Sequence, residues 1–131
     1  MTMLTNFKLY NDKKNRKLIV NQFYSNLNHE NIHDAVISLE ERKHQAFPHG
    51  EVYFQNDLPE ELQDELKLSK SDGLFIVQED NIQKGAVIPL QLIVQYLVAN
   101  RTQIVEEKEL SVIQLENIID RLELTLHTES L

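Results

Sequence analysis

The chain lacks cysteine and contains little glycine or proline. Its 131 residues include no cysteine, three glycines and three prolines. Without thiols there is no disulfide framework, no thiolate metal site and no cysteine nucleophile. No segment rich in glycine, proline or serine divides the chain, and its length is typical of one domain. We therefore expect a single domain over residues 1–131.

Long apolar segments are also missing. A long uncharged segment, residues 86–100, includes Pro89 and two glutamines. It is shorter and more polar than the ~18–20 apolar residues that cross a bilayer. The first residues contain no apolar run behind a basic start, which a secretory signal requires. We therefore expect a cytoplasmic protein that has no membrane association.

Acidic residues outnumber basic ones, and the two kinds are unevenly distributed. The net charge is −8, and residues 51–80 carry nine acids. An acidic surface repels phosphate backbones, so nucleic-acid binding is disfavoured. Five cations gather near the start of the chain: Lys8, Lys13, Lys14, Arg16 and Lys17. We interpret residues 13–17 as a solvated turn that has the capacity to contact a phosphate.

The apolar pattern predicts an α+β fold. Alternating or β-branched apolar residues predict strands over 6–10, 51–55, 74–77 and 86–88. Helical spacing predicts helices over 17–27, 28–46 and 58–67. The first of these helices competes with a strand over 18–20, which would pair with the first strand. The expected architecture is a small, mostly antiparallel sheet of three to four strands covered by helices.

Residues 89–131 are predicted to form a helical C-terminal part. Pro89 opens one helix that continues to residue 105, and Ser111 has the form of a cap for a second helix. This pattern predicts a C-terminal helix pair. The alternative is one long dimerising helix, because apolar residues recur at heptad spacing. They are Val98, Val105, Val112, Ile119 and Leu126. Either arrangement allows a homodimer through residues 89–131.

One short motif indicates a possible chemistry. His29-Glu30-Asn31-Ile32-His33 matches H-E-x-x-H and resembles the zincin metalloprotease signature. Histidines at i and i+4 of a helix can both bind one zinc ion, and the glutamate can deprotonate a metal-bound water. No third ligand follows at a zincin spacing, and His44 is one of the few nearby candidates. We expect no catalytic residue and no cofactor. The alternative is a zinc-dependent hydrolase with His29 and His33 as ligands and Glu30 as base.

An acidic cluster predicts an interaction surface. Four carboxylates repeat at i and i+4 on the short predicted helix: Glu60, Glu61, Asp64 and Glu65. The same segment contains apolar residues that we expect to be exposed: Val52, Phe54, Leu58 and Leu62. Such a surface attracts a basic partner, although a simple solvated helix face has the same composition. We expect a non-enzymatic protein–protein interaction protein of the adaptor, immunity/inhibitor or chaperone type.

Overall fold

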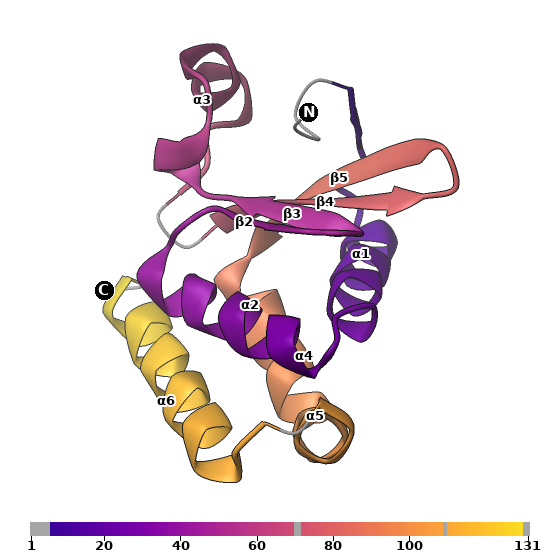
Figure 1. Ribbon diagram of the computed structural model, residues 1–131. Helices are drawn as coiled ribbons and strands as arrows, with labels where there is room; N and C mark the ends of the chain where they lie inside the picture. The colour runs from indigo at the N-terminus through magenta and orange to yellow at the C-terminus, as the bar shows by residue number, and fades with distance from the viewer. Residues whose placement is uncertain (1–5, 70–71, 109, 130–131) are drawn as a thin grey trace.

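The fold is α+β, as the sequence predicts. The computed structural model describes residues 6–69, 72–108 and 110–129 (Figure 1). The α-helices in these ranges are α1 (Lys13–Ser25), α2 (His29–Glu41), α3 (Glu60–Leu66), α4 (Leu90–Ala99), α5 (Arg101–Lys108) and α6 (Val112–Glu129). The strands are β1 (Lys8–Leu9), β2 (Gln45–Phe47), β3 (Gly50–Tyr53), β4 (Asp72–Glu79) and β5 (Ile82–Pro89). A short 3-10 helix, η2 (Gln55–Asp57), follows β3.

The strands form one sheet that has helices on both of its faces. The strand order is β1-β5-β4-β3-β2, and each neighbouring pair is antiparallel except β1 with β5. Figure 1 shows α3 above the sheet, and α1, α2, α4 and α6 below it. A layer of helices therefore covers the lower face, and α3 lies on the upper face.

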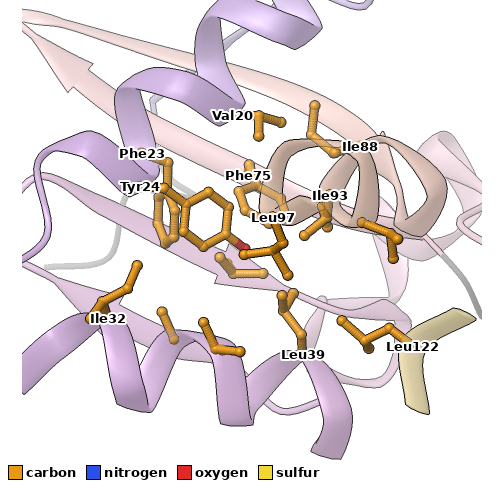
Figure 2. Close-up of a cluster of buried hydrophobic side chains, with 14 of the residues drawn as sticks. Val20, Phe23, Tyr24, Ile32, Leu39, Phe75, Ile88, Ile93, Leu97 and Leu122 are labelled. Atoms are coloured by element: carbon orange, nitrogen blue, oxygen red, sulfur yellow. The ribbon is translucent and has the colours of Figure 1, made fainter. Parts of the chain in front are cut away.

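The main core lies between the sheet and the helices below it (Figure 2). Phe23 and Tyr24 of α1 pack against Phe75 of β4, with ring centroids 5.0 Å and 6.2 Å away. Leu97 of α4 and Leu122 of α6 are buried in the same cluster. Burial of one such side chain stabilises the fold by about 1.5–3 kcal/mol. These contacts hold α1 and α4 against the sheet, and α6 packs against α4 and α2.

A smaller apolar cluster lies on the upper face. Tyr53, Leu74 and Ile76 are buried there from β3 and β4. Leu62 and Leu66 of α3 pack against this cluster. A spacing of four residues places both leucines on one side of the helix, so the apolar side of α3 faces the sheet.

The sheet has five strands, one more than the three to four that the sequence predicts. The additional strand is β2, which occupies residues assigned by helical spacing to the end of a helix over 28–46. The helix ends earlier because Arg42 adopts a left-handed conformation with φ 57°, and its N–H donates to Ser38 O. β2 then pairs with β3. Ala46 is therefore an exposed strand residue and not part of an apolar helix face.

The ambiguous segment at 17–27 is helical, and the alternative strand over 18–20 is wrong. α1 begins earlier than predicted, at Lys13, because the Asp12 carboxylate accepts a hydrogen bond from Asn15 N–H over 3.1 Å. Asn15 Nδ2 also donates to Asp12, over 2.6 Å. This side-chain bond, followed by the backbone bond, lowers the pKa of Asp12 because both favour the ionised carboxylate.

The C-terminal part contains a helix pair as predicted, α4 and α6, but the first helix ends at Ala99 instead of continuing to residue 105, and the short α5 follows it. The alternative of one long helix is wrong. Helical geometry is interrupted at Asn100, whose side-chain amide donates to Tyr96 O over 2.9 Å. Such a side-chain bond competes with continuation of the helix. Val112, expected in a heptad seam, is 56% exposed.

The uncharged segment over residues 86–100 forms the end of β5, then α4 and Asn100. Ile93 and Leu97 of α4 are fully buried in the main core. Within the described residues, no helix has both the length and the apolar character needed to cross a bilayer. The apolar side chains of α4 therefore serve the core.

Candidate functional site

The H-E-x-x-H motif occupies the first turn of α2. Asn28 caps this helix by accepting a hydrogen bond over 2.8 Å from a backbone N–H of the first turn. Glu30 is exposed and His33 is partly exposed. The Nδ1 atom of His33 lies 3.8 Å from a carboxylate oxygen of Asp34. The side chain of His29 lies outside the described part of the structure.

A metal centre around this motif is not assembled from the described residues. Among them, no three histidine, cysteine or acidic side chains are grouped to hold a metal ion. His44, the candidate third ligand, contacts residues of β3 instead. The zinc-hydrolase function rests on the sequence motif alone and stays a prediction.

His44 belongs to a polar cluster at the β2–β3 edge of the sheet. Its ring stacks on Tyr53 with centroids 4.2 Å apart and an interplanar angle of 18°. Its Nε2 atom lies 3.4 Å from an oxygen of Glu51, which is only 6% exposed. A polar neighbour offsets part of the cost of burying a carboxylate. Glu51 is therefore separate from the acidic surface that the sequence predicts over 51–80.

The four acids of the predicted interaction surface lie together on α3, and all are exposed. They are Glu60, Glu61, Asp64 and Glu65, and we call them the acidic surface. Within the described residues none of the four has an ion-pair partner. The two acids in the first turn interact favourably with the helix dipole. The structure thus brings together the whole residue set that the sequence selects.

The apolar residues expected beside these acids are not exposed. Val52, Phe54 and Leu58 are buried, and Leu62 packs against the upper-face cluster. All four residues of β3 are buried because both faces of the sheet are covered there. The prediction of an exposed apolar component was wrong. The surface of α3 that remains accessible is predominantly acidic.

A cavity of about 570 Å³ lies where the segments that flank α3 meet α2 and α6. It is lined by Glu40, Arg42, Phe54, Gln55, Asn56, Leu68, Ser69 and Thr125. The side-chain oxygen of Gln55 is buried and accepts no hydrogen bond from the described residues. The cavity therefore lies beside an unpaired acceptor that the protein encloses. The helical periodicity of the sequence does not predict this cavity, because its walls come from three separate parts of the chain.

A groove between α1 and α4 was not identified from the sequence. A first cavity of about 550 Å³ is lined by Lys13, Arg16, Lys17, Pro89, Gln91, Leu92 and Gln95. A second cavity of about 300 Å³ is lined by Lys17, Val20, Asn21, Leu92, Gln95, Tyr96, Ala99 and Asn100. Lys17, Leu92 and Gln95 line both cavities, so the two adjoin. We call them together the α1–α4 groove.

The groove is cationic at one end and mainly apolar at the other. Lys13, Arg16 and Lys17 lie on one face of α1. The segment is therefore a helix and not the predicted turn, although Lys13 and Lys17 are exposed to solvent as expected. Within the described residues none of the three forms an ion pair, and the Nε atom of Arg16 is buried without a hydrogen-bond partner. The run of cations over residues 13–17 was the one feature of the sequence that indicated this groove. The opposite wall of the groove, from α4, is more than 70 residues away along the chain, so local sequence patterns cannot predict that the two walls meet.

The predicted dimer interface over residues 89–131 includes exposed apolar side chains. Val112, Ile113 and Leu124 of α6 are large apolar residues that are exposed. Exposed apolar residues are common on monomers as well as at interfaces. The homodimer through residues 89–131 stays a prediction.

No protein-family model, curated protein or solved structure matches this chain. The acidic surface and the α1–α4 groove are the two features of the described residues that are suited to binding. These two features differ in charge and lie on different elements of the fold.

Proposed function

We propose that this chain is a small, non-enzymatic protein–protein interaction protein of the cytoplasm, of the adaptor, immunity/inhibitor or chaperone type. Its partner is another protein with a basic surface. The observation that carries the proposal is the acidic surface, which stands on the helix above the sheet (Figure 1). Nucleic acid is disfavoured as a partner by the same negative charge.

The acidic surface is suited to electrostatic recognition. Glu60 and Asp64, and likewise Glu61 and Glu65, are separated by four residues, so like charges lie next to each other on the helix. Their mutual repulsion is relieved when a partner supplies lysine or arginine side chains. Complementary charges raise the rate of association and select against acidic partners.

The cavity beside α3 adds a place for an anchoring side chain. Phe54 and Leu68 contribute apolar wall, and the buried oxygen of Gln55 has no donor among the described residues. A lysine or arginine has an apolar stem and a donating head. One such side chain of the partner would occupy part of the cavity and, once the Gln55 side chain turns to expose its oxygen, donate to it while its neighbours pair with the carboxylates of α3.

A charge-reversal experiment tests this proposal. The test variant replaces all four residues of the acidic surface by lysine. A matched control replaces four other exposed acids by lysine, so that its net charge changes equally. They are Asp34, Glu106, Asp120 and Glu123. Both variants and the wild type serve as bait in a lysate of the source organism, and the captured protein is purified for affinity measurement at low and high salt.

We expect a basic protein that binds the wild type and the control variant but not the α3 variant. Its affinity should fall with added salt, because screening over about 10 Å at 0.1 M weakens exposed charge pairs. Far-UV circular dichroism checks that the α3 variant remains folded. The proposal is wrong if no partner is captured, if the α3 variant retains the partner, or if the control variant loses it equally.

A further inference from the structure

We infer that the α1–α4 groove binds a small organic phosphate. The phosphate group occupies the cationic end, and an apolar or aromatic body lies against Leu92 and Tyr96. This site is independent of the proposed interaction function, because α1 and α4 lie below the sheet whereas α3 lies above it (Figure 1). The two proposals therefore fail or succeed separately.

The cationic end of the groove concentrates positive side chains at the start of α1, and this placement does not stabilise the helix. The first two turns of α1 carry four cations, and the first turn contains no acid. Positive charge near a helix N-terminus opposes the helix dipole, so the arrangement costs stability. Three of these cations, Lys13, Arg16 and Lys17, line one cavity without an ion-pair partner among the described residues. A dianionic phosphate would relieve their repulsion more fully than a singly charged carboxylate.

The geometry of Arg16 favours an oxyanion further. Its Nε atom is buried and has no acceptor among the described residues. A guanidinium group donates through a planar fork that matches two oxygens of a phosphate. Because the protein encloses this Nε atom, a ligand oxygen in the cavity would satisfy it once the Arg16 side chain turns toward the cavity.

The start of α4 supplies a second set of donors. This helix has ten residues, and Pro89 at its N-cap position provides no side-chain acceptor for the first-turn N–H groups. Pro89, Gln91 and Leu92 line the same cavity as the three cations. Unpaired first-turn N–H groups and the positive end of the helix dipole both favour an anion. The anion is thus approached from α1 by side chains and from α4 by the backbone.

The second cavity would hold the apolar or aromatic part of the ligand. It contributes about 300 Å³ next to the 550 Å³ of the cationic cavity, a combined size within the range of small-molecule sites. Val20, Leu92 and Tyr96 supply apolar contacts, and Asn21 and Asn100 supply amide groups. Inorganic phosphate would fill the cationic end alone. An organic phosphate would use both cavities.

Three probes separate the two halves of the site. Phenyl phosphate carries both the dianion and the ring, inorganic phosphate carries the dianion alone, and benzoate carries the ring with a single charge. Each is titrated into 15N-labelled protein, with the amide shifts of residues 90–92 as the readout. We expect phenyl phosphate to bind most tightly, with a Kd on the order of 1 mM, as befits a fragment of this size.

Charge-matched variants locate the site. Arg16→Gln and Lys17→Gln should each weaken phenyl phosphate binding about tenfold, the effect of one charge-assisted contact. Lys14→Gln removes the same charge from an exposed residue of α1 that does not line the groove, so it should have little effect. Ala99→Leu narrows the apolar cavity. It should weaken phenyl phosphate binding and leave inorganic phosphate binding unchanged.

Several results would overturn the inference. These are the absence of saturable shifts at residues 90–92, equal affinity for benzoate and phenyl phosphate, or equal losses in the Lys14 and Arg16 variants. Circular dichroism confirms folding of each variant. Lys17→Gln provides the same test if Arg16→Gln does not fold.

Discussion

Replacing Gly50 by alanine tests how α1 is held against the sheet. Gly50 is the buried first residue of β3, and the ring of Phe23 from α1 lies against it. An alanine Cβ at this position would lie 2.8 Å from Phe23 Cδ2 and 3.1 Å from the carbonyl oxygen of Ile76. The Phe23 ring has little room to move, because three other aromatic rings contact it with centroids 5.0 to 5.8 Å away. A displaced ring would shift α1, which forms one wall of the groove.

The expected magnitude follows from two opposing effects. Overpacking of this kind costs about 1–3 kcal/mol. Alanine also reduces the conformational entropy of the unfolded chain, which stabilises the folded state by about 0.4–1 kcal/mol. This gain is available at Gly50 because its φ angle is not positive, so alanine can adopt the same backbone conformation. We therefore expect Gly50→Ala to lower the free energy of unfolding by about 1.3 kcal/mol, the midpoint of a range of about 0–2.6 kcal/mol. Gly73→Ala is the matched control, since its nearest contact is a side-chain atom at 3.3 Å. It should change stability by less than about 0.5 kcal/mol.

Urea denaturation followed by far-UV circular dichroism measures both variants, which suits a chain without tryptophan. A double-mutant cycle with Phe23→Leu identifies the cause. In the Phe23→Leu background, Gly50→Ala should cost about 1 kcal/mol less, because the crowded ring is gone. Equal destabilisation by Gly50→Ala and Gly73→Ala, or an additive cycle, would refute the packing argument.

Three further predictions concern the core, a helix cap and the C-terminal helices. Burial raises the pKa of Tyr24 well above its ordinary value of 10, and its hydroxyl has no hydrogen-bond partner among the described residues. The unfolded chain ionises first, so stability should fall as pH rises above 10. Tyr24→Phe should abolish that part of the decline without lowering stability at pH 7; a loss above about 1 kcal/mol at pH 7 would show that the hydroxyl is paired. Asn28→Ala should cost about 1 kcal/mol in thermal or urea unfolding, because α2 loses its N-cap, and no change would contradict that role. Leu115→Ala should cost about 2–5 kcal/mol as a buried residue of α6. Arg101→Ala, which removes an exposed ion pair to α6, should cost less than about 0.5 kcal/mol, and the reverse order would contradict the assignment of the core.

Much of the fold could be predicted from local patterns. Apolar residues at helical spacing correctly predict α2, α4 and α6, and Asn28 correctly predicts where α2 begins. The acidic surface was also predictable, because charges on a short amphipathic helix are exposed wherever the helix packs. The prediction of helix ends failed where a local interaction that competes with the helix has no recognisable sequence pattern. Examples are the left-handed Arg42, which ends α2, and the amide of Asn100, which interrupts the long helix.

The amino-acid sequence by itself determined the class of fold, the principal helices and the exposure of the acids on α3, since periodicity and charge act over a few residues. Only the tertiary structure decided that Glu51 and Val52 are buried, because both faces of β3 are covered when the helices pack on the sheet. It also decided that Arg16 and Leu92 line one groove. These two residues are brought together by the packing of α1 and α4 on the same face of the sheet, and such non-local contacts leave no periodic signal in either segment.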